Sequence, residues 1–279
     1  MPNNILCRYA SLNTNSLIKT NNTQTQKDYI RYLRLQKFDI ICFQEAHVSS
    51  PEPIHSLNIH FQPKGSYWTQ HVGIISFSNN FHISLNNTSN IFVSSQFQLC
   101  KVDHPQKLYD FFYILNIYAP AHSSKERREF FDQIANMLYH MHEQITFANL
   151  IIAEDFNYSN DRSEYLSFAT STDWYALLGE FFHNSMVMND LIAISNFQRY
   201  RTDVIVSLVI DFIYIGDNIH HNLKDTHITH LHPSWSDHSI LSINFTTGFR
   251  LLDLDCREPI LFMLLIRYYI LKSLRKSIV

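Results

Sequence analysis

The stretch that most constrains this chain is Leu150-Ile-Ile-Ala-Glu-Asp-Phe-Asn157, an apolar run that leads directly into an acid and an amide. Such a run predicts a buried strand, and strand alternation would place the side chains of Asp155 and Asn157 on one face at its end. A carboxylate beside a neutral amide suits phosphate chemistry, because the acid can orient or deprotonate a water while the amide donates to an oxyanion. The alternative interpretation is a strand that ends in a simple Asx turn.

Composition sets outer limits on the function. The chain has 279 residues, 46% of them hydrophobic, which is enough for one large α/β domain. Its formal net charge of −3 provides no overall basic surface, so a nucleic acid would bind at a local patch or through a metal ion. The N-terminus has no signal-peptide pattern, so we expect an intracellular protein, nuclear or cytoplasmic, that is not secreted.

The cysteines agree with an intracellular location. The chain has four cysteines, Cys7, Cys42, Cys100 and Cys256, and no two of them have the C-x-x-C spacing of metal-binding motifs. Scattered cysteines of this kind predict buried free thiols in a reducing compartment.

Strand-like and helix-like segments alternate along the first part of the chain. Residues 5–12 and 38–43 have the apolar content of strands, and the spacing over residues 25–36 predicts a helix between them. The second strand runs into Glu45. Parallel strands joined by helices bring their carboxyl ends to one rim, so Glu45 and the acid of the later strand are expected to meet there. Taken alone, this alternation favours an open doubly wound sheet.

The middle of the chain continues the pattern. Strand-like segments cover residues 71–77, 97–102 and 109–118, and the residues from 78 to 90, rich in Asn and Ser, predict an exposed connection. The last strand places Tyr118 near its end, where a core or edge tyrosine is the alternative.

A capping box, Ser123-Ser-Lys-Glu126, opens the most strongly marked helix. Apolar residues at helical spacing then predict a helix over residues 124–144, with the pair Arg127-Arg128 on its solvated side. This helix leads into the Asp155 strand and completes a strand-helix-strand unit.

The second half of the chain carries a further acid and a histidine. A short helix is predicted over residues 174–182, and residues 204–215 predict one buried strand that Asp211 interrupts. A buried acid needs a partner or a metal ion. His238 follows Asp237 and precedes a strand over residues 239–245, so Asp211 is the expected partner that orients the His238 ring.

Other polar residues of this half can be interpreted as ordinary surface residues. Most histidines are expected to be exposed, among them His220, His221, His227 and His230. Residues 196–203 predict a loop, in which Arg199 and Arg201 either contact phosphates or are simply solvated.

Six motifs, in this order, resemble the endonuclease/exonuclease/phosphatase superfamily. They cover about residues 5–246 and are Ser-Leu-Asn13-Thr-Asn15, Phe-Gln-Glu45, Asn-Ile-Tyr118-Ala-Pro, Asp155-Phe-Asn157, Ile-Asp211-Phe-Ile-Tyr and Ser-Asp237-His238. Each motif is weak alone, whereas six in sequence are specific. The chain looks most like the apurinic-type endonuclease domain of LINE-type (non-LTR) retrotransposons, because Leu-Asn-Ile-Tyr-Ala-Pro, a helix and then Asp-Phe-Asn follow that branch's style.

The resemblance implies a four-layer α/β sandwich, with two packed mixed sheets flanked by helices as in DNase I, in place of the open sheet. It implies a domain over residues 1–246 and a C-terminal tail over residues 247–279. The implied activity is phosphodiester hydrolysis in DNA, a nicking reaction that requires Mg²⁺ or, alternatively, Mn²⁺. No membrane association and no obligate protein partner are indicated.

Roles for individual residues also follow from the resemblance. Glu45 is the implied principal metal ligand, helped by Asn13 and Asp237, and such oxygen donors suit a hard cation. Asp155 would position or activate the attacking water, and Asn157 and Tyr118 would hold the phosphate. His238, oriented by Asp211, would stabilise the transition state or serve as the base. The expected DNA contacts are Asn15, Asn196, Arg199 and Arg201.

The chain departs from the family's pattern in three places. Glu154 stands where the family usually has Gly before the Asp-x-Asn acid, and a residue with a Cβ is expected to strain the backbone there or displace Asp155. Asn196-Phe197 replaces the usual Thr-Phe, and Ser207-Leu-Val-Ile-Asp211 replaces Ser-Arg/Thr-Ile-Asp. These changes put nicking efficiency and substrate choice in doubt more than the fold.

Two other functions stay open beside the endonuclease. One is a degenerate transposon fragment without activity, favoured by the altered loops and by the tail, where no reverse transcriptase follows. The other is a phosphoesterase of the same superfamily that acts on inositol phosphates or phospholipid headgroups. The apolar run at residues 260–266 is far shorter than the ~20 residues of a membrane span, and with its basic neighbours it predicts an amphipathic helix or a remnant.

Overall fold

The computed structural model describes residues 4–19, 23–48, 50–85, 94–141, 145–157, 172–186 and 211–248, and the backbone of 198–201 and 204–207. All of them belong to one compact unit, Met1–Gly248. The tail beyond residue 248 lies outside the described residues, so the domain boundary after residue 246 stays a prediction. In the described part of the chain, no helix is long and apolar enough to cross a membrane.

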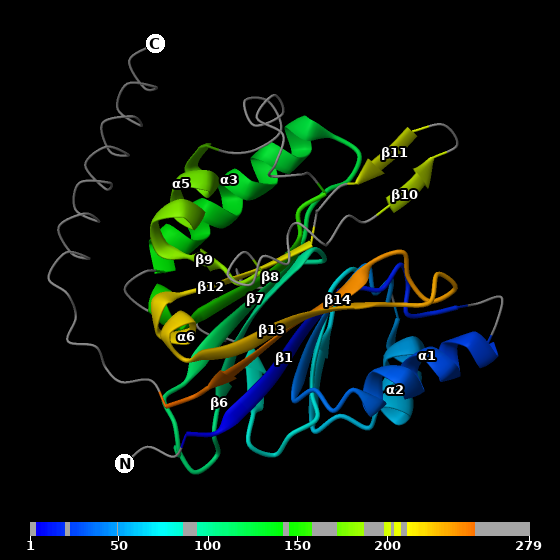
Figure 1. The fold of residues 1–279 in the computed structure, drawn as a ribbon, viewed down its shortest axis with the longest axis horizontal. Helices are drawn as coiled ribbons and strands as arrows, with labels where there is room; N and C mark the ends of the chain where they lie inside the picture. Colours follow the sequence, from blue (N-terminus) through cyan, green and yellow to red (C-terminus); the bar gives the residue numbers. More distant parts are fainter. Residues whose placement is uncertain are drawn as a thin grey trace, which may run out of the picture. The chain divides into compact units, whose positions relative to one another are not determined.

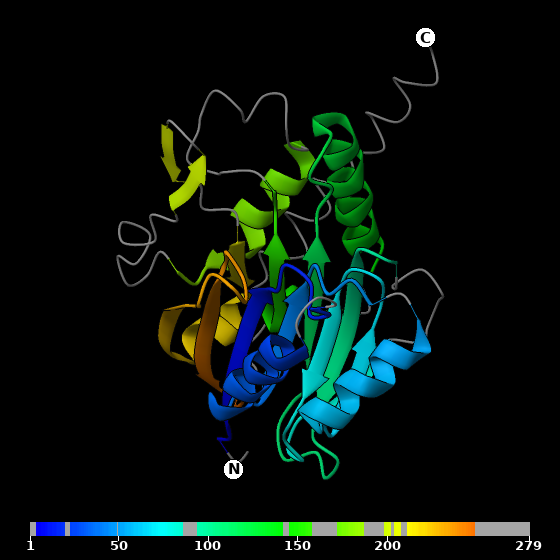
Figure 2. The same ribbon diagram turned by 90° about the vertical axis from the view of Figure 1, so that its right-hand side faces the viewer.

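The first sheet has six strands in the order β13-β14-β1-β2-β4-β3. The strands are β1 (Leu6–Asn13), β2 (Ile40–Gln44), β3 (Gly65–Trp68), β4 (Gly73–Ser76), β13 (Leu223–His230) and β14 (Ser239–Thr246). Only β1 and β2 run parallel, and the other neighbours pair antiparallel. Helices α1 (Thr23–Leu35) and α2 (Pro51–Phe61) cover the outer face of this sheet (Figure 2).

The second sheet also has six strands, in the order β5-β6-β7-β8-β12-β9. They are β5 (His82–Leu85), β6 (Phe97–Asp103), β7 (Phe112–Tyr118), β8 (Leu150–Asp155), β12 (Asp211–Ile215) and β9 (His183–Asn184). Here β7 and β8 are the parallel pair. Helices α3 (Ser124–Met141) and α5 (Thr172–Phe181) pack on its outer face (Figure 1), which confirms the four-layer sandwich and excludes the open sheet.

The region of the arginines differs from the prediction. Residues 204–215 do not form one strand: β11 (Val204–Ser207) pairs with β10 (Gln198–Arg201) in a separate two-stranded sheet, and β12 starts at Asp211. Arg199 and Arg201 therefore lie on a strand and not in a loop. The sequence pattern misled because the apolar residues on both sides of Asp211 look like one continuous run.

Helix α3 begins as its capping box predicts and buries one face. The Ser123 Oγ accepts a hydrogen bond from the Glu126 backbone N–H at 3.2 Å. Arg127 is not on the solvated side: it is buried, and its Nη1 donates to the carbonyl oxygens of Pro120 at 2.9 Å and Ala121 at 3.3 Å. The arginine thus ties the helix to the turn after β7, a contact that helical spacing alone does not reveal.

Several elements escaped prediction because their sequences are polar or short. The edge strand β13 exposes half of its side chains and buries only one, so it lacks an apolar signal, and β5 lies inside the segment predicted to be an exposed connection. Helix α2 buries only Leu57 and Phe61. The small helices η1 (Phe147–Asn149) and α6 (Asp217–His221) complete the described part of the fold.

The predicted burial of the cysteines and the predicted exposure of four histidines can be compared with the structure. Cys7, Cys42 and Cys100 are buried free thiols, as predicted, and Cys256 lies outside the described residues. Of the four histidines expected at the surface, His221, His227 and His230 are exposed. His220 is half-buried, because its ring stacks on that of His183 with centroids 4.0 Å apart.

The two sheets are joined by a buried amide network as well as by apolar packing. Gln44 of β2 donates from Nε2 to Asn116 Oδ1 of β7 at 2.7 Å. Asn116 in turn donates from Nδ2 to the carbonyl oxygens of Phe43 and Gly73, both at 3.0 Å. Because these polar groups are fully desolvated, each bond satisfies an atom that would otherwise destabilise the fold, and the network holds β2 and β7 in one relative register.

Glu154 occupies the opposite face of β8 from Asp155. Its register partners, Ile117 and Phe212, belong to the apolar cluster beneath α3 and α5. The side chain is fully buried, and neither carboxylate oxygen has a hydrogen-bond partner among the described residues. Burial, and then the charge of Asp155, raise its pKa well above the usual value. The expected backbone strain is absent, since Glu154 keeps regular strand pairing and is not among the residues with positive φ.

Glu154→Gln is expected to stabilise the protein increasingly as the pH rises. Below its usual pKa of 4.5 the carboxyl is neutral in the folded and the unfolded state and adds no pH-dependent cost. Stability then falls as pH rises from that value toward the folded pKa. In this window the gap in unfolding free energy between variant and wild type should widen by about 1.4 kcal/mol per pH unit.

Urea unfolding at pH values from about 4 to about 9 measures this gap. Groups that do not interact with Glu154 titrate alike in both proteins and cancel from the gap. Glu129→Gln, on the exposed face of α3, serves as the matched control and should show no such slope. A gap that does not change with pH would mean that Glu154 is not an unpaired buried acid.

Candidate active site

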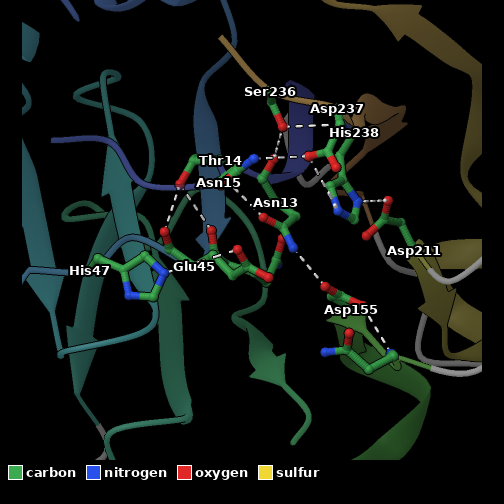
Figure 3. A network of polar contacts seen from close by, with 12 residues as sticks. Asn13, Thr14, Asn15, Glu45, His47, Asp155, Asp211, Ser236, Asp237 and His238 are labelled. Carbon is green, nitrogen blue, oxygen red and sulfur yellow. Dashed lines mark hydrogen bonds and ion pairs between the residues drawn. The ribbon is translucent and has the colours of Figure 1, made fainter. Parts of the chain in front are cut away.

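Most of the predicted site residues that the structure describes lie at one edge of the sandwich, where both parallel strand pairs end (Figure 3). Asn13 ends β1 and Glu45 follows β2 in the first sheet, while Tyr118 and Asp155 end β7 and β8 in the second. The carboxyl ends of parallel strands meet at one rim in each sheet, and packing the two sheets face to face brings the two rims together.

Asp155 is held from both sheets. Asn13 Nδ2 donates to Asp155 Oδ2 at 2.6 Å across the sandwich, and the Asn157 backbone N–H donates to Asp155 Oδ1 at 2.9 Å. The second bond is an Asx turn, the alternative that the sequence left open. Strand alternation does not direct Asn157, because β8 ends at Asp155 and Asn157 has a φ of 52°. Its side chain instead donates from Nδ2 to the Ala119 carbonyl at 2.7 Å.

The Asp155 carboxylate has an altered proton affinity. Burial and the negative charge of Asp211 raise its pKa, while the charge of His238 and the bonds from Asn157 and Asn13 lower it, for a net value of about 7. A carboxylate with a pKa near neutrality is suited to take a proton from water and hold it. The geometry and the charge of Asp155 thus both agree with the role of a general base.

His238 and Asp211 form the pair that the sequence predicted. The His238 Nδ1 lies 2.6 Å from Asp211 Oδ2, and both side chains are mostly buried. Burial lowers the pKa of His238, but the carboxylates of Asp211, Asp155 and Asp237 raise it more, to about 10. The ring is therefore an imidazolium at neutral pH, and it donates to Asp211 and presents a positive charge beside Asp155.

The turn after β1 links the two sides of the site. Asn15 Nδ2 donates to Asp237 Oδ1 at 3.2 Å, and the Asn15 backbone N–H donates to Asn13 Oδ1 at 2.9 Å. Asn15 and Ser16 have φ angles of 44° and 70°, and Asn is one of the few residues that adopt this region readily. Ser236 Oγ donates to the Asn13 carbonyl at 2.8 Å, so the Asp237-His238 segment is fastened to the same turn.

Glu45 has neighbours that sequence reasoning missed. Its carboxylate and burial raise the pKa of the Tyr118 hydroxyl well above the usual range, so the phenol stays protonated. His47 Nε2 lies 4.0 Å from Glu45 Oε2. The rings of His71 and Tyr118 lie 5.6 Å apart, and those of His47 and His71 lie 5.7 Å apart. No local motif marks His71, because only the antiparallel pairing of β2 with β4 brings it beside Glu45. His47 follows Glu45 by two residues but belongs to none of the six motifs.

Two groups of side chains offer donors for a divalent cation. In the described residues, ligand atoms of Asp155, Asp211 and His238 all lie within 4.8 Å of one another, and Asp211 Oδ1 has no partner there. The set that the resemblance implies, Glu45, Asn13 and Asp237, is an all-oxygen set around the Asn13–Asn15 turn (Figure 3). His238 can bind a metal only after losing a proton, whereas oxygen donors suit a hard cation without that step.

The predicted DNA contacts are only partly described. Asn15 lies exposed at the site and bonds Asp237. Arg199 and Arg201 are on β10, but their side chains are not described, and Asn196 lies outside the described residues. Their proposed contacts with phosphates stay predictions.

Comparison with known proteins shows which solved structures share this fold. No family model and no curated protein matches the chain by sequence. Among solved structures, the 3′-5′ exonuclease NExo from Neisseria meningitidis aligns with a TM-score of 0.62 and 18% identity over 85% of this chain and 99% of that one. An AP endonuclease from Archaeoglobus fulgidus aligns with a TM-score of 0.59 and 16% identity over 86% and 99% of the two chains.

The endonuclease domain of TRAS1, a telomere-specific non-LTR retrotransposon, has a TM-score of 0.57 and 12% identity over 86% of this chain and 98% of that domain. These neighbours are nucleases and phosphatases of DNase I-like architecture. The chain thus has the fold of the endonuclease/exonuclease/phosphatase proteins, as the sequence motifs implied.

In the metal-free protein, the His238 ring is expected to titrate near pH 10. Asp211→Asn removes the carboxylate that contributes most to the upward shift, so the pKa of His238 should fall by at least about one unit. NMR of the ring C–H protons measures both values. Asp217→Asn, which breaks the separate His183–Asp217 pair, is the control and should leave the His238 titration unchanged. Equal titration in wild type and Asp211→Asn would contradict the pairing.

Proposed function

We propose that this protein is a Mg²⁺-dependent DNA endonuclease of retrotransposon origin, with Mn²⁺ as an alternative cation. The observation that carries the proposal is the convergence of Asp155, held by Asn13 and Asn157, on the His238–Asp211 pair at the edge that also carries Glu45. A general base, a fixed positive charge and oxygen ligands within one site are what phosphodiester hydrolysis requires.

The protein's own side chains account for most of the reaction. Asp155, with its pKa of about 7, accepts the proton of the attacking water. The His238 imidazolium, kept charged by Asp211, stabilises the negative charge that develops on the phosphate oxygens. The protonated Tyr118 hydroxyl and the Asn157 amide donate to the phosphate. Glu45, Asn13 and Asp237 would hold the cation, which would supply Lewis-acid stabilisation of developing negative charge.

DNA is the proposed substrate because fold and motifs agree. NExo from Neisseria has been solved with a product DNA hairpin, and TRAS1 provides an endonuclease domain of the retrotransposon type. The LINE-like segment around Tyr118 favours the retrotransposon branch over the inositol-phosphate and phospholipid phosphoesterases. With a net charge of −3, the protein has to bind DNA through the local positive groups of the site and through the cation.

Nicking of supercoiled plasmid tests the proposal. Wild type is expected to nick with Mg²⁺ or Mn²⁺ and to stop when EDTA is added. Glu45→Gln, which keeps the side-chain volume but removes the charge, should lower the rate by about a hundredfold or more. Glu129→Gln on the outer face of α3 controls for the loss of one carboxylate far from the site. Equal nicking by Glu45→Gln and wild type would refute the metal assignment.

Further assays on the same purified protein distinguish the other two candidate functions from the endonuclease. Release of phosphate or headgroup from inositol phosphates or phospholipids, without nicking, would identify a phosphoesterase. A folded protein that neither cuts DNA nor binds a divalent cation would be a degenerate, non-catalytic fragment.

A further inference from the structure

Lys19 lies beside the site, on the segment that follows the Asn13–Asn15 turn. Its Nζ donates to the Asn15 carbonyl at 2.8 Å and lies 6.0 Å from the centre of the Tyr29 ring. The side chain is half-buried, unlike a free surface lysine, whose ammonium group is fully solvated. A hydrogen bond to the turn that carries the proposed metal ligand Asn13 gives this amine a defined position.

The charge of Lys19 acts on the proposed metal ligands. Burial lowers the pKa of its ammonium group, and the carboxylates of Asp237 and Glu45 act in the opposite direction. Both residues adjoin the turn that Lys19 contacts: Asp237 Oδ1 accepts from Asn15 Nδ2 at 3.2 Å, and the Glu45 carbonyl accepts from the Ser16 backbone N–H at 2.9 Å. The ammonium group therefore partly balances these two carboxylates in the metal-free protein, and it would repel a divalent cation bound by them.

We propose that Lys19 is a positioning residue that sets the metal affinity of this site: its ammonium group balances Glu45 and Asp237 and lowers their affinity for a divalent cation. The inference rests on the proposed metal ligands of the endonuclease. Nothing in the sequence motifs indicated it, because Lys19 is one polar residue in a polar turn.

Loss of the Lys19 charge and structural damage to the turn should change the cation affinity in opposite directions. Removing a positive charge near two carboxylates should strengthen the binding of a cation, by on the order of three- to tenfold for a partly solvated charge at low salt. Loosening the turn would scatter the ligands and weaken binding instead. Glutamine separates the two effects, because its amide can still donate to the Asn15 carbonyl while carrying no charge.

The experiment is calorimetric titration of the full-length, metal-free protein with Mg²⁺ and with Mn²⁺, without DNA and at low ionic strength. Lys19→Gln is expected to bind each cation about three- to tenfold more tightly than wild type. Lys19→Arg keeps the charge and should bind as wild type does. The gain of Lys19→Gln should shrink as salt screens the interaction. Lys101→Gln is the matched control: Lys101 lies on β6 with its Nζ over the Phe111 ring, and its removal should leave cation binding unchanged.

Unchanged or weaker cation binding by Lys19→Gln would overturn the proposal, and so would a gain of the same size in Lys19→Arg. A wild type that binds neither cation would overturn it together with the metal assignment. The plasmid assay keeps the two proposals apart. A protein that binds cations with the expected pattern but does not nick DNA leaves the role of Lys19 standing and removes the endonuclease proposal.

Discussion

The hydrogen bond between Asn13 and Asp155 is the contact on which the rest of the site depends. It joins the end of β1 in one sheet to the end of β8 in the other, over 2.6 Å and fully buried. Apolar packing between two sheets tolerates small slips, whereas a buried amide–carboxylate bond tolerates almost none, because losing it leaves both groups unsatisfied. Together with the Gln44–Asn116 bond deeper in the sandwich, it sets the distance between the two rims.

Charge is the second constraint on this edge. Glu45, Asp155, Asp211 and Asp237 lie close together, and carboxylates crowded in a partly desolvated site repel one another. Positive charge and proton uptake reduce this repulsion: His238 is protonated, the Lys19 ammonium group is bound to the Asn15 carbonyl beside the site, and the pKa of Asp155 rises toward neutrality. The resulting proton affinities are those that base catalysis and transition-state stabilisation use at physiological pH.

The outer face of the second sheet holds a buried carboxyl without losing the fold. Glu154, next in sequence to Asp155, keeps regular β8 pairing, and its burial raises its pKa, which favours the neutral carboxyl. Neighbours at 12–18% identity keep the same sandwich, since two apolar sheet faces and their helices can be built from many sequences. Glu154 thus leaves Asp155 in regular strand pairing, and its effect is expected in the pH dependence of stability.

The sequence by itself determined the strands and helices with strong apolar periodicity, the six motifs, and through them the sandwich and the pairing of Asp211 with His238. These features depend on neighbours along the chain or on a motif order that is visible without coordinates. Only the tertiary structure decided the Asn157 turn, the burial of Arg127, the division of residues 204–215 between two sheets, and the positions of His71 and Lys19 beside Glu45. The physical reason is that burial and charge are set by residues distant in sequence, so a polar residue in a turn looks the same in sequence whether it faces solvent or a carboxylate.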